Sequence, residues 1–198
     1  RPEFAHAIAL FENCLARLSR AGATVIDPCD LPSAEELQNL RSCVFRVEFK
    51  AAFNAFLQDN DAPCGIRTLR DLIAWNELHP GAVPYGQSLL IAAEATQGLD
   101  DPAYRVDRAR DIELARNAGI KAALEMHEVH ALIAPMGAAA KGTGKAGAPV
   151  VTIPAGLDSE GVPFGVSLFA TAGSDARLLA IAAAVELVIG SRHTPNHR

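Results

Sequence analysis

The sequence predicts an α/β fold in which helices surround a mixed sheet. Two short apolar runs, Val150–Ile153 and Phe164–Phe169, flank a turn-rich connection, Ala155–Pro163, in which Asp158–Gly161 is a plausible tight turn. β-branched residues bounded by Gly, Pro, Asp and Ser are typical of a buried strand, a turn and a second strand. The segment that follows, Ser174–Ser191, has a strongly helical pattern. Helical patterns and short apolar runs also follow one another earlier in the chain, which is typical of an α/β arrangement.

Length and composition describe a globular protein. The chain has 198 residues, 49% of them hydrophobic, and a formal net charge of −5. This length is enough for one sizeable domain, and we expect residues 1–198 to form a single domain. The acidic balance and the lack of a basic cluster argue against nucleic acid as a partner. The apolar stretch Leu178–Ile189 contains Glu186 and is too short to span a bilayer, so no membrane segment is expected.

The start of the chain and the cysteines bear on processing and compartment. No signal peptide is visible, since Arg1-Pro2-Glu3 leads directly into a helical pattern, and a start without Met suggests a processed, trimmed or incomplete chain. The compartment is left open, with the cytoplasm favoured. No CxxC pair is present, which favours buried free thiols over a zinc site or disulfides for Cys14, Cys29, Cys43 and Cys64.

The first part of the chain predicts a helix, a strand and a long helix. Apolar residues at helical spacing predict a helix over Phe4–Arg20, and Gly22 stands where a C-terminal capping glycine belongs. Ala23–Ile26 then reads as a short strand that ends at Asp27-Pro28. Ser33–Gln58 is a long helical candidate that opens with a capping box of the form S-x-x-E. Within it, a stripe at helical spacing favours the core-facing side of a helix and consists of Phe45, Phe49, Phe53 and Phe56.

The middle of the chain is mainly helical. Thr68–His79 predicts a helix capped by Thr68 and ended by Pro80-Gly81, and a second helix is expected over Ser88–Thr96. Tyr104–Val129 is the longest helical candidate, and Asn117-Ala118-Gly119 is expected to break it in mid-course. Ala131–Ala134 predicts a strand that ends at Pro135.

Two patterns imitate ligand motifs. Gly142–Gly147 matches GxGxxG, but a dinucleotide fingerprint leaves a strand and opens a helix, whereas this segment leads into Val150–Ile153. We therefore expect a flexible loop that joins two strands. His127 and His130 are not spaced as in HExxH and have no third ligand nearby in sequence, so a solvated helix end is favoured over a metal site.

The C-terminal third resembles the amidase signature family, whose members hydrolyse carboxamide C–N bonds. AGAPVVTIPAG, GVPFGVSLFA and LLAIAAAVE are similar to the family pattern AGxPxxxVPxG, G-x-P-x-G and an apolar helix ending near a Glu. The residues that match are Ala146, Gly147, Pro149, Val150, Ile153, Pro154, Gly156, Gly161, Pro163, Gly165 and Glu186.

The resemblance extends from about Ile8 to Ser191. EFKAAFNAFL resembles the E-F-K-x-x-x-N-x-[FY]-L pattern of fungal and peptide-amidase-like members, through Glu48, Phe49, Lys50, Asn54 and Leu57. It implies the C-terminal part of the amidase signature fold, with substrate-pocket candidates Tyr85, Gln87, Met136 and Lys145. Met136 stands where the family usually has Thr.

The catalytic part of the family pattern has no counterpart in this sequence. The family uses a Ser–cis-Ser–Lys triad, in which the serines lie in a GGSSGGS-type loop and a distant Lys is the base. This chain contains neither a Ser-Ser nor a Gly-Gly pair, and its only lysines are Lys50, Lys121, Lys141 and Lys145. No catalytic residue, metal ligand or cofactor is therefore carried over.

Two hypotheses follow, with an enzyme of unrelated chemistry given little weight. The chain is the C-terminal portion of an amidase-signature hydrolase, completes the fold and the substrate pocket, and meets its small-molecule amide substrate only together with a catalytic half. Alternatively, it is a truncated non-catalytic pseudoenzyme that binds a partner or self-associates, for example as a homo-oligomer.

Overall fold

A computed structural model describes residues 2–60, 65–158, 160–190, 192 and 194. The chain divides into two compact units. The first, here called the sheet unit, comprises Arg1–Asn39 and Asp111–Arg198, and the second, the helical unit, comprises Leu40–Arg110. Cys64 and Ser159, on which a thiol and part of a turn were predicted, lie outside the described residues.

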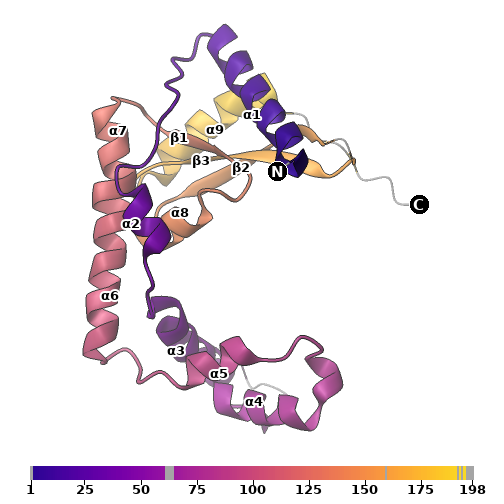
Figure 1. The fold of residues 1–198 in the computed structure, drawn as a ribbon, viewed down its shortest axis with the longest axis vertical. Coiled ribbons are helices and arrows are strands. Elements are labelled where there is room, and N and C mark those ends of the chain that lie inside the picture. Colours follow the sequence, from indigo (N-terminus) through magenta and orange to yellow (C-terminus); the bar gives the residue numbers. More distant parts are fainter. Residues whose placement is uncertain (1, 61–64, 159, 191, 193, 195–198) are drawn as a thin grey trace. The chain divides into compact units, whose positions relative to one another are not determined.

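The sheet unit contains an antiparallel sheet of three strands (Figure 1). The strands are β1 (Leu132–Pro135), β2 (Val150–Leu157) and β3 (Pro163–Phe169), in the order β1-β3-β2. Leu168 of β3 lies opposite Ile133 on one side and Val151 on the other. β3 is thus the central strand, and all of its residues from Phe164 to Phe169 are buried.

The predicted fold class is confirmed: an α/β arrangement in which helices accompany a sheet. Both predicted strands of the hairpin form, although β2 continues to Leu157 instead of ending at Ile153. The pairing shifts by a bulge between Pro154 and Gly156, and a bulge is where a strand tolerates proline. The pairings are antiparallel, whereas a mixed sheet was expected.

The prediction of a strand over Ala23–Ile26 is wrong, because this segment has no backbone hydrogen bonds of the kind that join strands. The segment follows α1 (Pro2–Arg20) and Gly22, which has the positive φ of 97° expected at a helix end, but it forms no ladder with a strand of the sheet. Its apolar and β-branched residues favour an extended chain, yet a strand also needs a neighbour that supplies hydrogen bonds. No such neighbour lies beside it among the residues that the structure describes.

α1 and α9 (Asp175–Ile189) contact each other and the sheet (Figure 1). α9 is almost entirely apolar, and Leu178 and Ile189 have no exposed surface. The Arg17 guanidinium of α1 donates to the Val188 carbonyl near the end of α9, where backbone acceptors lack partners within the helix. Packed against α1, β2 and β3, α9 thus contributes the buried Leu178, Ala182 and Ile189 to the core of this unit.

The helical segment after Ile112 does not break where Asn117-Ala118-Gly119 predicted a break. α6 (Pro102–Ile112) continues as the π-helical stretch η3 (Glu113–Lys121) and as α7 (Ala122–Met126). A Cβ on Gly119 would lie 2.6 Å from the Leu114 carbonyl oxygen and 3.0 Å from Ser33 Oγ. Glycine is used here for close packing inside a wide helical turn rather than for a break.

The predicted loop Gly142–Gly147 is mostly a helix. α8 (Ala140–Ala146) packs against η3, and α2 (Ala34–Asn39) also contacts η3. α8 ends at Gly147, whose left-handed φ of 62° is typical of a helix terminus. The local glycine content favours a loop, but tertiary contacts decide the conformation.

The helical unit contains α3 (Val44–Asp59), α4 (Leu69–Leu78), the short η2 (Pro80–Ala82), α5 (Ser88–Glu94) and the first part of α6. The predicted single helix Ser33–Gln58 is two helices, α2 and α3, which belong to different units. α3 begins anew at Cys43, whose backbone N–H donates to Asp107 Oδ2 at 2.8 Å.

The phenylalanine stripe of α3 does not face the core, contrary to the prediction. Phe45 is 76% exposed and Phe56 is 58% exposed, whereas the buried residues of this helix are Val44, Val47 and Leu57. Phe45, Phe49 and Phe53 instead stack on one another, with centroid separations of 6.2 and 5.4 Å. The helical period places the phenylalanines on one side of α3, but the buried side of the helix is the one that carries Val44, Val47 and Leu57.

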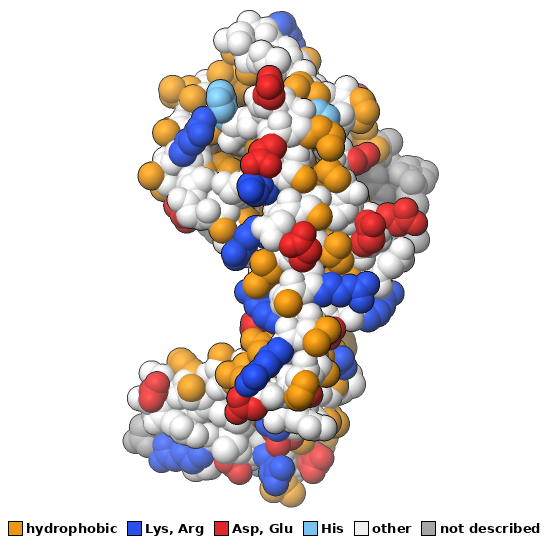
Figure 2. Space-filling model, turned by 90° about the vertical axis from the view of Figure 1, so that its left-hand side faces the viewer, with side chains coloured by type: hydrophobic (Ala, Val, Ile, Leu, Met, Phe, Trp, Pro, Cys, Tyr) orange, Lys and Arg blue, Asp and Glu red, His pale blue; other side chains and the backbone are white. Residues whose placement is uncertain are grey.

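The surface is mixed in charge. On the face drawn in Figure 2, acidic and basic side chains are interspersed with apolar ones. In the described part of the chain, no helix is long and apolar enough to cross a membrane.

We predict that Gly165→Ala destabilises the sheet unit by about 1–3 kcal/mol, because overpacking a tight core has a cost of that order. The added Cβ would lie 2.9 Å from Thr152 Cγ2 and 3.2 Å from the Ile153 carbonyl oxygen of the neighbouring strand. Gly144→Ala in α8 is the control, since its Cβ meets nothing within 4 Å and alanine favours a helix. Urea denaturation of both variants measures the difference, and equal stabilities would contradict this account of β3.

Candidate functional site

The sequence candidates for the substrate pocket are divided between the units. Tyr85 and Gln87 belong to the helical unit, and Met136 and Lys145 to the sheet unit. Tyr85 is fully exposed before α5, so its ring is available to a ligand. The Gln87 side chain is already engaged, because its Oε1 accepts from Asn76 Nδ2 at 2.9 Å and its Nε2 donates to the Ile73 carbonyl at 3.2 Å. Their role in a substrate pocket stays a prediction.

Met136 occupies a strained turn directly after β1. Its φ is 50°, in the left-handed region that a residue of this size rarely adopts. The turn is held from β3: the Met136 N–H donates to the Gly165 carbonyl at 2.9 Å, and Ser167 Oγ donates to the Met136 carbonyl at 2.7 Å. Ser167 Oγ also lies 2.9 Å from Thr152 Oγ1 of β2. All three strands thus fix this backbone, while the Met136 side chain remains 46% exposed.

Backbone strain of this kind persists only where the surroundings over-determine it, and it concentrates at functional sites. The arrangement can hold the exposed Met136 side chain in one place beside a ligand. The sequence singled out Met136 from the family pattern, but the Ser167–Thr152 support beneath it was not predicted. The sequence feature that could have indicated this support is the pair of hydroxyl residues, Thr152 and Ser167, at opposed positions of the hairpin.

Lys145 is held in an ion pair. Its Nζ lies 2.7 Å from Asp111 Oδ1, and the Asp111 side chain is only 1% exposed. Beside it, Arg116 Nε donates to the Ala146 carbonyl at 2.7 Å, near the end of α8. A buried carboxylate needs such a partner because its desolvation is costly. These contacts bind α8 to Asp111 at the end of α6 and to Arg116 in η3. Lys145 therefore has a structural role.

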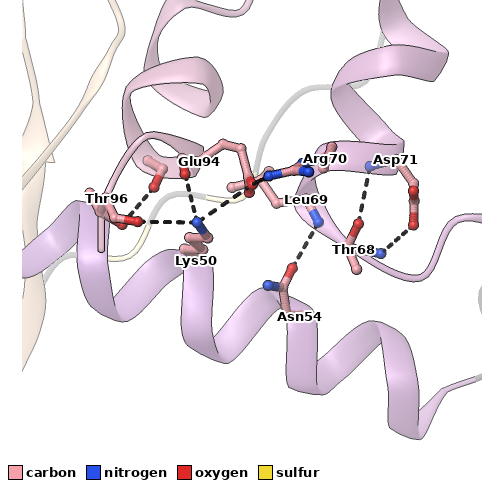
Figure 3. A network of polar contacts seen from close by, with 9 residues as sticks. Lys50, Asn54, Thr68, Leu69, Arg70, Asp71, Glu94 and Thr96 are labelled. Carbon is pink, nitrogen blue, oxygen red and sulfur yellow. Dashed lines mark hydrogen bonds and ion pairs between the residues drawn. The ribbon is translucent and has the colours of Figure 1, made fainter. Parts of the chain in front are cut away.

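Lys50, the other lysine that matches a family pattern, lies in a polar network of the helical unit (Figure 3). Its Nζ donates to the carbonyl oxygens of Glu94 at 2.6 Å and Thr96 at 3.2 Å, and lies 3.5 Å from the Glu94 carboxylate. The same carboxylate contacts Arg70 at 3.3 Å. Lys50 thereby satisfies carbonyl groups at the end of α5, where the helix itself supplies no donors.

Two further residues of the same pattern also join helices. Asn54 Oδ1 accepts from the Leu69 N–H at 2.8 Å at the start of α4 (Figure 3). Glu48 accepts from Tyr104 Oη at 2.9 Å, and this hydrogen bond raises the pKa of Tyr104. The spacing of Glu48, Lys50 and Asn54 in α3 therefore serves to bind α6, α5 and α4 to one helix.

A cavity of about 940 Å³ lies in the sheet unit, and sequence reasoning missed it. Its lining includes β1, the extended segment Ala23–Ile26, and apolar residues of α1 and α9. His127, His130 and Lys141 also line it, whereas the four pocket candidates do not. The sequence feature that could have indicated this cavity is the apolar, β-branched composition of Ala23–Ile26, because such a segment needs apolar side chains or another strand packed against it.

The thiols and histidines have no catalytic arrangement in the described residues. Cys14, Cys29 and Cys43 are free, and burial is the main reason why the pKa of each of these thiols is raised, which disfavours the reactive thiolate. Within the described ranges, no group of three or more His, Cys, Asp or Glu side chains has an arrangement that could hold a metal ion.

Comparison with known proteins agrees with the fold. No family model matches the chain. It is 29% identical over 194 residues to a probable amidase of Arabidopsis thaliana, a match that covers 94% of this chain and 37% of the plant protein. The structure of the peptide amidase from Stenotrophomonas maltophilia is 34% identical with a TM-score of 0.85, and covers 95% of this chain and 41% of that one. An amidase family protein from Bacillus anthracis is 25% identical with a TM-score of 0.78, over 96% and 36% of the two chains.

The antiparallel sheet, its helices and these likenesses make the chain similar to one part of amidase-type proteins. More particularly, the chain is related to the amidase signature family and matches the C-terminal region of its members, as the sequence motifs implied. It spans less than half the length of each relative that it matches over most of its own length.

We predict that Lys145→Met destabilises the sheet unit by about 3 kcal/mol, because it removes the Lys145 ammonium from beside a buried carboxylate. Lys121→Met is the matched control: Lys121 pairs with Glu125 at 3.6 Å on the surface, where both side chains are more than half exposed. An exposed pair of this kind contributes about 0.5 kcal/mol or less. Equal losses of unfolding free energy in the two variants would contradict a buried role for Lys145.

We also predict a pH-dependent contribution at the start of α4. Hydrogen bonds from the Thr68 side chain and the Arg67 N–H lower the pKa of Asp71 from its ordinary value of 3.8. A lowered pKa in the folded state gives stability that is present above pH 3.8 and is lost as the pH falls through the lowered value. Asp71→Asn should therefore be less stable than the parent at pH 6, and the difference should shrink below about pH 4. A constant difference from pH 6 to about pH 2 in denaturant titrations would refute this.

Proposed function

We propose that the chain is the C-terminal portion of a hydrolase that acts on carboxamide C–N bonds, and that residues 1–198 form a single C-terminal domain which carries no catalytic triad of its own. The observation that carries this proposal is the likeness to the peptide amidase over 95% of this chain but only 41% of that protein. The function of the chain is then to complete the fold and to form part of the substrate pocket beside catalytic residues that lie elsewhere.

The structural contacts of the lysines support the proposal that the catalytic residues lie outside this chain. Hydrolysis of an amide needs an activated nucleophile, a base and donors for the oxyanion. Three of the four lysines donate to a structural partner: Lys50 to the Glu94 and Thr96 carbonyls, Lys141 to the Gln38 carbonyl and Lys145 to Asp111. Lys121 forms an exposed ion pair with Glu125.

The exposed side chains provide the substrate-facing part of the proposal. Tyr85 is fully exposed and Met136 is 46% exposed on a rigid turn, so both are able to contact a small amide without rearrangement. We assign each of them, in its own unit, a contact with the substrate. Gln87 and Lys145 are assigned positioning roles, because their polar groups are bonded within the protein.

The second candidate function is that of a non-catalytic binding or self-association module. The exposed Phe45 and Phe56 of α3 favour it, with Phe45 stacked on the half-buried Phe49, because exposed apolar groups mark interfaces. The coding sequence upstream of Arg1 discriminates between the two: a GGSSGGS-like loop and a Lys in frame support the hydrolase, and a start codon directly before Arg1 supports the module.

We predict that the purified 198-residue chain does not hydrolyse simple carboxamides. When the chain replaces the matched portion of the Stenotrophomonas maltophilia peptide amidase, hydrolysis of a peptide amide should appear. In that chimera, Tyr85→Ala and Met136→Ala should raise KM about tenfold or more with a smaller effect on kcat, as expected for lost substrate contacts. Exposed Leu78→Ala in α4 is the control, because Leu78 is 80% exposed and is no pocket candidate.

Turnover by the isolated chain well above background would refute the proposal that catalysis needs a second part. Lys50→Arg and Lys145→Arg then show whether a lysine is the base, since arginine keeps the ion pairs but is always protonated. Turnover lost in either variant points to a different mechanism, and turnover kept in both excludes a lysine base at these positions.

A further inference from the structure

The hydrogen bonding between β1 and β3 changes at the residue that follows β1. In an antiparallel ladder, two opposed residues that bond each other exchange two hydrogen bonds, one from each N–H. The register of β1 and β3, continued beyond Pro135, brings Met136 opposite Gly165. Only half of the exchange forms here, because the Met136 N–H donates to the Gly165 carbonyl at 2.9 Å. The Met136 carbonyl instead accepts from Ser167 Oγ at 2.7 Å, so it does not serve as acceptor for the Gly165 N–H.

A side chain replaces the second half of this exchange. The Gly165 N–H donates to Met136 Sδ at 3.5 Å. Gly165 is buried in the central strand, whereas a thioether sulfur is only a weak acceptor. A buried backbone donor therefore has a partner that satisfies it weakly, and a stronger acceptor in the same place would lower the free energy of the folded state.

The same sulfur is accessible to small oxidants. Met136 is nearly half exposed, and exposed methionines are oxidised to the sulfoxide. Hydrogen peroxide transfers one oxygen atom to the thioether: an S–O bond forms, the O–O bond breaks, the sulfur is oxidised by two electrons, and the peroxide is reduced to water. The new oxygen is a polar acceptor on the atom that already faces the Gly165 N–H. Because the side chain is open to solvent, the sulfur has room to retreat while the oxygen takes its place.

We propose that Met136 is a site of reversible oxidation, and that its sulfoxide oxygen replaces the sulfur as acceptor of the Gly165 N–H. Oxidation then attaches the turn after β1 more firmly to β3 and converts an apolar exposed group into a polar one. A methionine sulfoxide reductase restores the thioether. This inference does not depend on the substrate contact assigned to Met136, because the hydrogen bonds that carry it lie within the sheet unit.

The chain contains a matched control in its other methionine. Met126, at the end of α7, is 65% exposed, and its sulfur accepts no hydrogen bond within the described ranges. Exposure predicts that both methionines are oxidised. Only at Met136 does the sulfur contact a backbone donor, so only there should oxidation change the hydrogen bonding of the sheet.

The test compares Met126→Leu, in which Met136 is the remaining methionine, with Met136→Leu, in which Met126 remains. Both chains carry glycine labelled with nitrogen-15 and are treated with hydrogen peroxide. A thiol reductant then reverses disulfides and sulfenic acids at the cysteines but leaves sulfoxides in place. Peptide mass spectrometry locates the added oxygen, and NMR spectroscopy follows the Gly165 amide.

Oxidation of Met126→Leu should move the Gly165 amide proton downfield and slow its exchange about fivefold, because a full hydrogen bond replaces a weak one. Methionine sulfoxide reductase should reverse both changes. Peroxide should change neither quantity in Met136→Leu. Met136→Gln, whose side-chain carbonyl is an acceptor that peroxide does not alter, should show the downfield Gly165 signal without treatment and no response to peroxide.

Several results would overturn the proposal. One is a Met136 that gains no oxygen in the folded chain under conditions that oxidise Met126. Another is an oxidised Met136 whose Gly165 signal stays in place, moves upfield or exchanges faster. A third is the same change at Gly165 in peroxide-treated Met136→Leu, which would trace the effect to other residues. Loss of the circular dichroism of the folded chain on oxidation of Met136 would also count against it, since a stronger hydrogen bond is expected to stabilise the sheet.

Discussion

The double pairing of β3 is the constraint on which the sheet unit depends. Its residues from Phe164 to Phe169 are buried, and each of its edges already bonds a neighbour, so it has no freedom to shift register. A slip by one residue would turn Leu168 and Val166, which are buried, to the opposite face. Gly165 allows Thr152 and Ile153 of β2 to lie close to β3. Because β3 also pairs with β1, the position of β2 constrains the position of β1.

The helical unit is held together in a different way. Its helices bury few large side chains, and polar groups of α3 bridge the remaining elements instead: Lys50 binds the end of α5, and Asn54 binds the start of α4. A hydrogen bond adds about 1 kcal/mol of stability, so several such contacts are needed to replace a large core. A unit with few buried apolar contacts opens more readily by local unfolding. The exposed phenylalanines of α3 then remain as surface available to a partner.

Local chemistry was sufficient to predict the elements whose signals are local. The hairpin β2–β3, the helix α9 and the Thr68 cap of α4 follow from strand composition, helical period and capping. The prediction failed where tertiary contacts decide. Gly142–Gly147 has the composition of a loop but forms α8 against η3, and the phenylalanine period of α3 does not show which of two apolar stripes is buried.

In the candidate site, too, the sequence indicated individual residues but not the tertiary contacts that hold them. Motif resemblance selected Met136 and Lys145, but the partners that hold them, Ser167 and Asp111, lie 31 and 34 residues away along the chain. Contacts over such separations have no signature in a single sequence. The cavity was missed for a related reason: Ala23–Ile26 was predicted to be a strand, and only the structure shows that it forms no ladder with any other described segment.

The open edge of β1 and the strained turn at Met136 belong to one physical problem. Met136 follows Pro135, the last residue of β1, and its backbone bonds Gly165 and Ser167 of β3, while Thr152 of β2 supports Ser167. A strand paired on one side leaves its other edge free to move, and the left-handed φ of Met136 stores energy that such motion can release. The pairing of β1 with β3 and the conformation of Met136 are therefore coupled, because the turn begins where this short strand ends.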